Sequence, residues 1–221
     1  ELINARITAR DAGELAIMIN KYIDYEENPP TAANFYANPI VACGFQTERW
    51  FQLCTEVIHG FWENELGMSP VRQYNLYSGS PAAGDAWSTN ANTQMVVDYF
   101  GPTGLDYLPA TIPAEIDWNS GSAAGINAAI NAGAFILQHR DHGAETGWGE
   151  PDYQSSDLPG LSNSMLPWVF SINCLTGRFD YSTDTFAEVF HRMPGGALGL
   201  TAATQVSYSF VNDTYIFGLY D

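Results

Sequence analysis

Basic residues are scarce in this chain of 221 residues. Only 8 lysines and arginines stand against 25 aspartates and glutamates, which gives a formal net charge of −17 at pH 7. A surface with this excess of negative charge repels nucleic acid phosphates and anionic lipid headgroups. We therefore exclude nucleic acid and membrane as partners. The charge suits an extracytoplasmic protein or one that binds divalent cations.

Long apolar runs and a disulfide framework are also missing. No stretch approaches the roughly 18 consecutive apolar residues of a transmembrane helix, so no membrane insertion is expected. The chain has neither a signal-peptide pattern nor an initiator methionine, and we expect a section of a longer precursor. Its three cysteines are an odd number. At most Cys43 and Cys54 pair, which leaves Cys174 free.

Apolar and aromatic residues are plentiful. Hydrophobic residues make up 46% of the chain and aromatic residues 14%. This composition supports a packed core and argues against disorder, and the length fits one large domain.

Short apolar runs alternate with segments of helical periodicity. We expect strands over 2–8, 39–44, 71–77, 134–138, 167–173 and 197–204, and helices over 11–26, 49–66, 93–100, 123–132, 185–193 and 212–220. In the first helix, Leu15, Met18, Ile19 and Tyr22 share one face. Residues 101–120 read as a long loop. Continuous apolar strands separated by helices predict an α/β fold with a parallel sheet covered on both faces.

His142 and Cys174 each follow a predicted buried strand. In such sheets ligands bind beyond the carboxyl ends of the strands. A cysteine thiolate there can be a nucleophile, and a neighbouring imidazole can activate it. Gly143 lets its N–H approach a substrate carbonyl closely, and with the N–H of Cys174 it would form an oxyanion hole.

Simpler roles exist for the same residues. A lone cysteine on a buried strand is usually a small hydrophobic residue, and a histidine at a strand end is usually a satisfied polar one. A metal site is not favoured, because alternate residues of a strand point apart; its ligands would be His139, Asp141, His142 and Glu145. The spacing alone does not decide between catalysis and packing.

Two motifs resemble those of the gingipain family of cysteine peptidases. The stretch HGAETGWG (His142–Gly149) is similar to the family's histidine motif, close to HG-[SA]-ET-x-WG, and SINCLTGRF (Ser171–Phe179) resembles its nucleophile strand. The continuation FAEVFHRMPGGALGLTAATQVSY resembles the following helix, turn and strand, and GELAIMINKYIDYEENPP the helix that precedes this subdomain.

The resemblance implies a caspase-like three-layer α/β/α sandwich and a secreted or outer-membrane-associated bacterial peptidase. It implies that Cys174 attacks the substrate carbonyl and that His142 is the general base and acid. The N–H groups of Gly143 and Cys174 would stabilise the oxyanion. The substrate would be a protein or peptide, no cofactor is required for the chemistry, and other parts of the precursor are expected partners.

The chain departs from the family pattern beside the histidine. Asp141 stands where the family usually has glycine, and its carboxylate either favours the imidazolium or points to solvent. Gingipains also orient the histidine with an acid on the loop after an earlier strand. Glu48 is the only acid on that loop here, although an acid in the first turn of a helix also has a structural role. Asp85 is a second candidate.

Substrate specificity and metal binding are less well defined. Trp50, Phe51 and Gln52 occupy the stretch in which basic-specific gingipains carry an acid, so basic specificity is not carried over. We expect Ser207 and Tyr208 to line the substrate pocket and Trp148 to pack the loop. Gingipain-like domains often bind structural calcium, for which the loops offer Asp152, Asp157 and Asp180; as an alternative these are solvated charges.

Two other functions fit the same residues. A sortase-like transpeptidase of the same family would pass the acyl group to an amine instead of water. A non-catalytic structural or adhesion module would retain the fold without the reaction.

Overall fold

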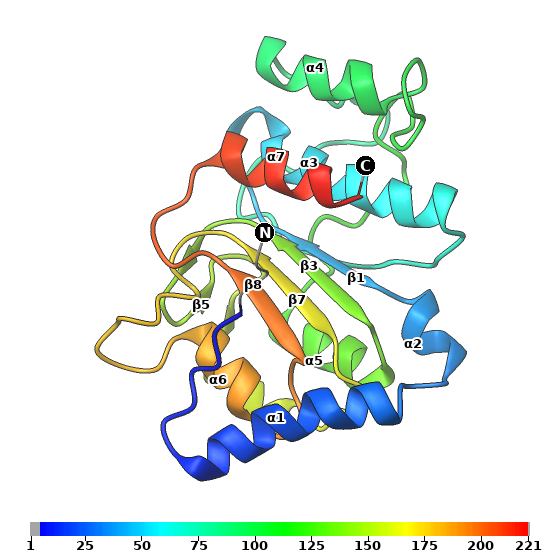
Figure 1. Cartoon of the computed structure of the whole chain (residues 1–221). Helices are drawn as coiled ribbons and strands as arrows, with labels where there is room; N and C mark the ends of the chain where they lie inside the picture. Colours follow the sequence, from blue (N-terminus) through cyan, green and yellow to red (C-terminus); the bar gives the residue numbers. More distant parts are fainter. Residues whose placement is uncertain (1–4, 221) are drawn as a thin grey trace.

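A five-stranded parallel sheet lies at the centre of the computed structural model, which describes residues 5–220 (Figure 1). The strand order is β2-β1-β3-β7-β8, and every pair of neighbours is parallel. The strands are β1 (Ile40–Cys43), β2 (Val71–Tyr74), β3 (Ile136–Arg140), β7 (Trp168–Ile172) and β8 (Gly199–Ala202). The predicted parallel sheet is therefore confirmed.

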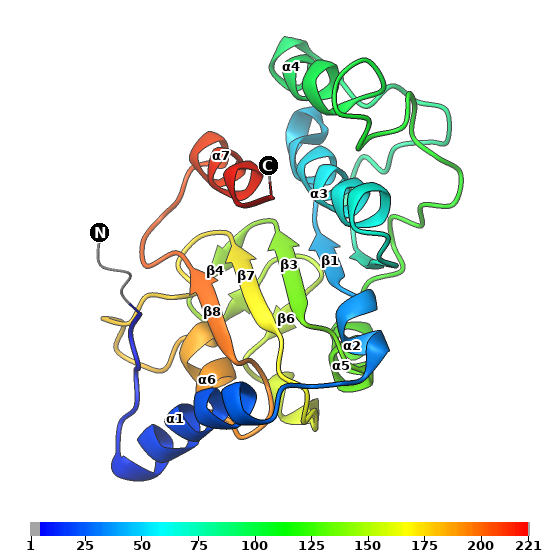
Figure 2. The same cartoon turned by 45° about the vertical axis from the view of Figure 1, so that its right-hand side comes forward.

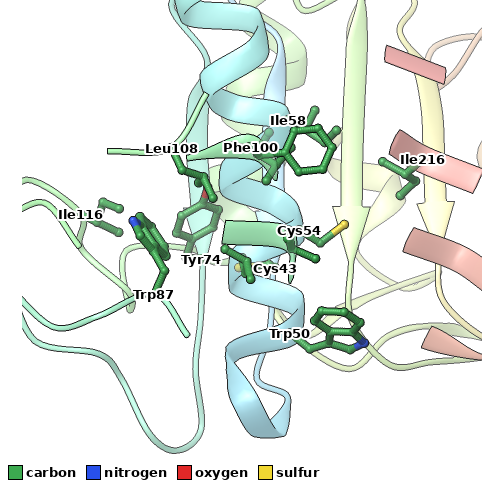
Figure 3. Close-up of a cluster of buried hydrophobic side chains, with 14 of the residues drawn as sticks. Cys43, Trp50, Cys54, Ile58, Tyr74, Trp87, Phe100, Leu108, Ile116 and Ile216 are labelled. Carbon is green, nitrogen blue, oxygen red and sulfur yellow. The ribbon is translucent and has the colours of Figure 1, made fainter. Parts of the chain in front are cut away.

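An apolar core lies on each face of the sheet. Val41 and Cys43 belong to one buried cluster, whereas Ile40 and Ala42 belong to the other. Successive side chains of a strand point to opposite faces, so a run of continuous apolar residues serves both. Figure 3 shows the first cluster, where Cys54 and Ile58 lie with Tyr74 and Ile216.

Helices cover the two faces in separate layers (Figure 2). On the first face lie α3 (Trp50–Gly60), which continues into a π-helical turn (Phe61–Glu65), and α7 (Ser209–Tyr220). Helix α4 (Ala91–Phe100) packs on the outer side of α3. On the second face lie α5 (Ala123–Ala132) and α6 (Phe186–Arg192). This is the expected three-layer α/β/α sandwich.

Helix α1 (Ala12–Glu27) packs against α6 and buries a narrower stripe than its sequence predicts. Met18 is buried, but Leu15 and Ile19 are 41% and 39% exposed. Lys21 is buried instead, because its ammonium group donates to the carbonyl oxygens of His191 and Ala197 at 2.8 and 2.9 Å. The predicted apolar face is therefore confirmed only in part, since Met18 is buried and Tyr22 half-buried, whereas Leu15 and Ile19 are exposed.

The first predicted strand, over residues 2–8, is not formed in the part of this segment that the structure describes. Residues 5–8 are irregular, and residues 2–4 lie outside the described part. The carbonyl oxygen of Thr8 accepts from Arg192 Nε at 2.7 Å, which ties this segment to α6. A short helix, α2 (Ala33–Ala37), was not predicted. The long loop over 101–120 is confirmed.

A small antiparallel sheet follows β3 and was also not predicted. It consists of β4 (Gly143–Ala144), β5 (Gly147–Trp148) and β6 (Tyr153–Gln154). Strands of two residues are too short to carry a periodic signal. This hairpin sheet contributes Trp148 and Tyr153 to the second core.

The three cysteines are free thiols. Cys43 and Cys54 are both fully inside the first core, and burial raises the pKa of each thiol. The pairing that the sequence left open is therefore not made. Among residues 5–220, no helix has the length and apolar character needed to span a bilayer.

Candidate active site

His142 and Cys174 occupy equivalent places beyond two neighbouring strands. The register of β3 and β7 ends with Arg140 opposite Ile172, and each candidate residue lies two positions further along its strand. Parallel neighbours are about 4.8 Å apart, so residues in matching positions leave the sheet side by side. The sheet therefore delivers the two side chains to the same edge.

Gly143 lies directly against the end of the nucleophile strand. A Cβ atom placed on Gly143 would lie 2.7 Å from the Cγ of Asn173 and 2.9 Å from the carbonyl oxygen of Cys174. Real Cβ atoms do not come this close to backbone atoms, so a side chain at this position would push the two segments apart. Glycine follows the histidine because the hairpin sheet closes onto the Cys174 segment.

The thiol of Cys174 is half-buried against the segment that joins β8 to α7. Its Sγ lies 3.5 Å from both the carbonyl oxygen and the N–H nitrogen of Ser207. The Ser207 hydroxyl donates to the carbonyl of Asn173 at 2.8 Å and accepts from Asn212 Nδ2 at 2.9 Å. The structure thus places Ser207 against the Cys174 thiol, and substrate binding by Ser207 stays a prediction.

The residue after the nucleophile has an unusual backbone. Leu175 has a φ of 64°, in the left-handed region that non-glycine residues rarely adopt. Such strain clusters at functional sites, where surrounding contacts hold it in place. Here the turn carries the chain sharply away from β7, so that Cys174 lies at its tip.

Tyr208 follows Ser207 and is 71% exposed. Its ring is therefore available on the surface next to the segment that contacts Cys174. No described contact tests its role, and substrate binding by Tyr208 stays a prediction.

The imidazole of His142 is largely exposed and rests edge-on against Phe51, with ring centroids 5.2 Å apart. Partial burial lowers the pKa of His142, and the positive charge of Arg140 lowers it further, whereas the negative charge of Glu150 raises it. The pKa of His142 is lowered overall, which favours the neutral imidazole, the form that accepts a proton.

Arg140 lies under His142 on the same side of β3 and is fully buried. Its guanidinium stacks 4.1 Å above the ring of Phe51, and its Nε donates to Asp213 Oδ1 of α7 at 2.6 Å. Because α7 begins two residues after Ser207, this ion pair fixes the segment that contacts Cys174. Sequence reasoning missed the pair, since nothing in the pattern relates β3 to a helix so distant in the chain.

On the other side of β3, His139 joins the segments that carry His142 and Cys174. Its Nδ1 accepts from Asn173 Nδ2 and its Nε2 donates to the carbonyl oxygen of Glu150, both at 2.9 Å. The ring stacks on Trp148 at 3.9 Å with the planes 4° apart. Burial lowers the pKa of His139 to about 3, so the ring is neutral. It acts as a bridge, not as a metal ligand.

Trp148 packs the loop, as predicted. Its side chain is 1% exposed, and its Nε1 donates to Ser171 Oγ at 2.8 Å. The hairpin that carries His142 is thereby attached to β7, the strand that carries Cys174.

Asp141 is buried and does not point to solvent. Its Oδ2 accepts from the N–H of Glu150 at 2.6 Å, and its carboxylate fills the space above Gly44, where a Cβ atom would lie 2.5 Å from it. Burial raises the pKa of Asp141 to about 7. The solvent-exposed alternative for this residue is therefore wrong.

The two acids proposed to orient His142 make other contacts. Glu48 accepts from Asn92 Nδ2 of α4 at 3.4 Å, and Asp85 pairs with Arg49 at 3.0 Å. Sequence reasoning did not consider Glu150, whose charge does act on His142. The feature of the sequence that could have pointed to Glu150 is its position, one residue after the histidine motif.

The candidate calcium ligands do not converge. Asp152 and Asp157 both contact Gln154, and Asp180 pairs with Arg178. Within the described residues, no group of three or more histidine, cysteine, aspartate or glutamate side chains is arranged to hold a metal ion. Calcium also takes backbone and amide oxygens as ligands, so structural calcium stays a prediction.

Comparison with known proteins gives one family. The model of "Peptidase family C25" matches residues 1–221. Gingipain R2 of Porphyromonas gingivalis (strain ATCC BAA-308 / W83) is 33% identical over 214 residues, which cover 92% of this chain and 24% of that protein. Gingipain R1 of the same species is 33% identical over 82 residues, or 34% of this chain and 8% of that protein. The chain thus spans about a quarter of gingipain R2.

Solved structures show the same fold. The Arg-specific cysteine proteinase gingipain R superposes with a TM-score of 0.65 and 19% identity, covering 90% of this chain and 39% of that one. A complex of the pro- and mature domains of RgpB from Porphyromonas gingivalis gives a TM-score of 0.64 and 17% identity, covering 96% and 44%. The expected caspase-like fold is confirmed.

Proposed function

The chain belongs to peptidase family C25, and we propose that it is the catalytic part of a cysteine endopeptidase. Cys174 is the nucleophile and His142 is the general base and acid. The observation that carries this proposal is the register of β3 and β7, which takes both residues the same distance beyond paired strands. The contact between Gly143 and the Cys174 carbonyl supports it, because it brings the two segments together.

In the first half of the reaction, His142 takes the proton of the Cys174 thiol. The thiolate attacks the substrate carbonyl carbon, and the carbonyl oxygen becomes an oxyanion. His142 then gives its proton to the leaving amine as the C–N bond breaks. A thioester between Cys174 and the acyl half of the substrate remains.

In the second half, water replaces the amine. His142 takes a proton from water, the hydroxide attacks the thioester carbonyl, and the C–S bond breaks. The proton held by His142 returns to the sulfur, which restores the starting state. The chemistry needs no cofactor, and structural calcium stays a prediction without assembled ligands.

The oxyanion would be held by the N–H groups of Gly143 and Cys174. The close approach of these two residues supports this assignment, since both N–H groups belong to the segments that meet at the sheet edge. Donors fixed by the fold before the reaction need no rearrangement as the charge develops.

The substrate is proposed to be a polypeptide, which Ser207 and Tyr208 would contact beside the thiol. Ser207 is already in place against Cys174. We further propose that the whole protein is secreted or associated with the outer membrane of a bacterium. The chain would be a section of a longer precursor whose other parts contact it, as the pro- and mature domains of RgpB do.

Cleavage of an unfolded protein such as reduced casein tests the proposal. We expect the wild-type chain to produce peptides and Cys174→Ala to produce none. Cys43→Ala is the matched control, because it removes a buried thiol of the core and should cleave like the wild type. Cleavage that survives Cys174→Ala, or no cleavage by the wild type, would contradict the assignment.

A further inference from the structure

An apolar groove lies between α4 and α7, beside the first residue of α3 (Figure 2). Its volume of about 420 Å³ falls within the range of roughly 300–1,000 Å³ that small-ligand sites occupy. Most of its lining is aromatic or aliphatic and includes Trp50, Met95, Val96, Tyr99, Phe210 and Phe217. Trp50 and Val96 are buried, whereas Met95 and Phe210 are 67% and 60% exposed. The groove thus has a buried base and an open apolar rim.

Aromatic contacts bound the groove at its two ends. The ring of Trp50 packs edge-on against Phe210 with centroids 5.2 Å apart, and the ring of Phe100 contacts Phe217 with centroids 4.8 Å apart. Phe210 and Phe217 are about two turns apart on α7, or roughly 10 Å along the helix axis. This length leaves room for a large side chain between the two contacts.

The end of the groove at Trp50 adjoins the candidate active site. Phe51, the next residue of α3, holds its ring against the imidazole of His142 at 5.2 Å. On the other wall, Ser207 precedes Phe210 by three residues and contacts the Cys174 Sγ at 3.5 Å. The two segments that touch the proposed base and nucleophile therefore also form the near end of the groove.

The groove offers little to a basic side chain. Among the described residues that line it, Asp213 alone carries a formal charge. Its Oδ1 accepts from Arg140 Nε at 2.6 Å, and its Oδ2 is shut off from solvent. A lysine or arginine side chain placed here would lose its hydration without gaining a carboxylate of its own. An apolar side chain would lose contact with water and no hydrogen bond.

We propose that this groove is a specificity subsite and that it takes a large apolar side chain, aromatic or long aliphatic, of a polypeptide substrate. The inference rests on the proposed function, in which Cys174 attacks a peptide bond. The side chain would belong to a residue within a few positions of that bond, because the groove begins three residues from Ser207. Gingipain R is Arg-specific, whereas this chain would cleave near an apolar residue.

Cleavage of a random peptide library by the wild-type chain, read by mass spectrometry, tests the preference. We expect phenylalanine, tyrosine, tryptophan, leucine or methionine to be selected at one position near the cleaved bond. Two peptides that differ only at that position then give the size of the effect. The value of kcat/KM for the phenylalanine peptide should exceed that for the lysine peptide by about tenfold to a hundredfold.

A charge on the rim should weaken this preference. Met95→Glu replaces an exposed rim side chain, and we expect it to lower the ratio of the two kcat/KM values by about tenfold. Val211→Glu is the matched control, because it adds the same charge to a residue of α7 that is 66% exposed and lies outside the groove lining. It should keep the wild-type ratio. Alkylation of Cys174 by iodoacetamide should be equal in both variants, which shows that the thiol is unaffected.

A wild-type preference for lysine or arginine, or no preference at all, would overturn the inference while the proposed function stands. A ratio that Met95→Glu leaves unchanged would also overturn it.

Binding of the two peptides to Cys174→Ala, measured by fluorescence anisotropy, separates this inference from the proposed function. The phenylalanine peptide should bind more tightly by a similar factor, and Met95→Glu in the same background should remove most of the difference. If this holds while the wild type cleaves neither peptide, the proposed function fails and the groove stands as a peptide-binding site. Equal binding of both peptides would overturn the inference, as would a dimer in sedimentation that Met95→Glu dissociates, since a second copy would then occupy the groove.

Discussion

The two faces of the segment from His139 to His142 carry different kinds of polar group. Arg140 and His142 face α3, where both contact the ring of Phe51, and His142 is open to solvent. His139 and Asp141 face the hairpin sheet, where both are buried and bind the backbone of Glu150. Alternation along a strand separates the two sets.

The two faces therefore have different roles in the proposed site. The first face holds His142, the proposed base, and Arg140, whose charge lowers the pKa of His142. The second face holds none of the proposed catalytic groups, but it ties the hairpin to the end of β7 through His139, Asn173 and Trp148. One four-residue segment can thus supply both the base and the framework that positions it.

The largest effect is expected from breaking the ion pair on the first face. Arg140→Met leaves the carboxylate of Asp213 buried without its partner, so we expect a loss of about 3–5 kcal/mol in the free energy of unfolding, measured with urea. The double variant Arg140→Met with Asp213→Leu should recover most of that loss. A single variant as stable as the wild type would show that the pair does not anchor α7.

The free energy of unfolding is expected to depend on pH through Asp141 of the second face. Burial raises the pKa of this carboxyl from 3.8 to about 7, so the native state binds more protons than the unfolded state between these values. Stability contributed by this group is present at low pH and is lost as pH rises toward 7. The free energy of unfolding of Asp141→Asn minus that of the wild type should therefore increase between pH 4 and pH 8, by up to about 4 kcal/mol.

Denaturant unfolding of both proteins at pH 4 and pH 8 measures this change. Asp152→Asn, an exposed aspartate of the same loop, serves as the control that should show no such growth. A constant difference between Asp141→Asn and the wild type would mean that Asp141 is ionised in the folded protein at all these pH values.

A smaller effect is expected from removing the bridge. His139→Leu leaves Asn173 and the Glu150 carbonyl without their partner, and we expect a loss of about 2 kcal/mol at pH 8. Because burial lowers the pKa of His139 to about 3, this loss should shrink as pH falls from about 6.5 toward 3. Urea unfolding at pH 8 and pH 5 measures it; an equal loss at both would contradict a neutral buried ring.

Sequence reasoning located the strands that carry the site but not the contacts between their ends. The runs before His142 and Cys174 are short but continuously apolar, so their burial and direction could be predicted. The hairpin sheet could not, because its strands have two residues each. The contacts of the Glu150 backbone with His139 and Asp141 depend on that hairpin and were missed with it.

Tertiary contacts also decide features that residue type does not reveal. The loop position makes Glu48 a candidate orienting acid, and this role stays a prediction. In the structure Glu48 and Arg49 have positive φ values, and the side chain of Glu48 meets Asn92 of α4. Lys21 was not expected in the interior, and it is buried because carbonyl groups of a distant segment accept from it. Sequence periodicity does not reveal either partner.

The central claim is that His142 activates Cys174. The most direct measurement is the rate of Cys174 alkylation by iodoacetamide from pH 4 to pH 9, mapped by mass spectrometry, for wild type and His142→Ala. The account predicts rapid modification of Cys174 below pH 7 in the wild type and its loss in the variant. Equal profiles for the two proteins would show that the dyad is not assembled in this chain.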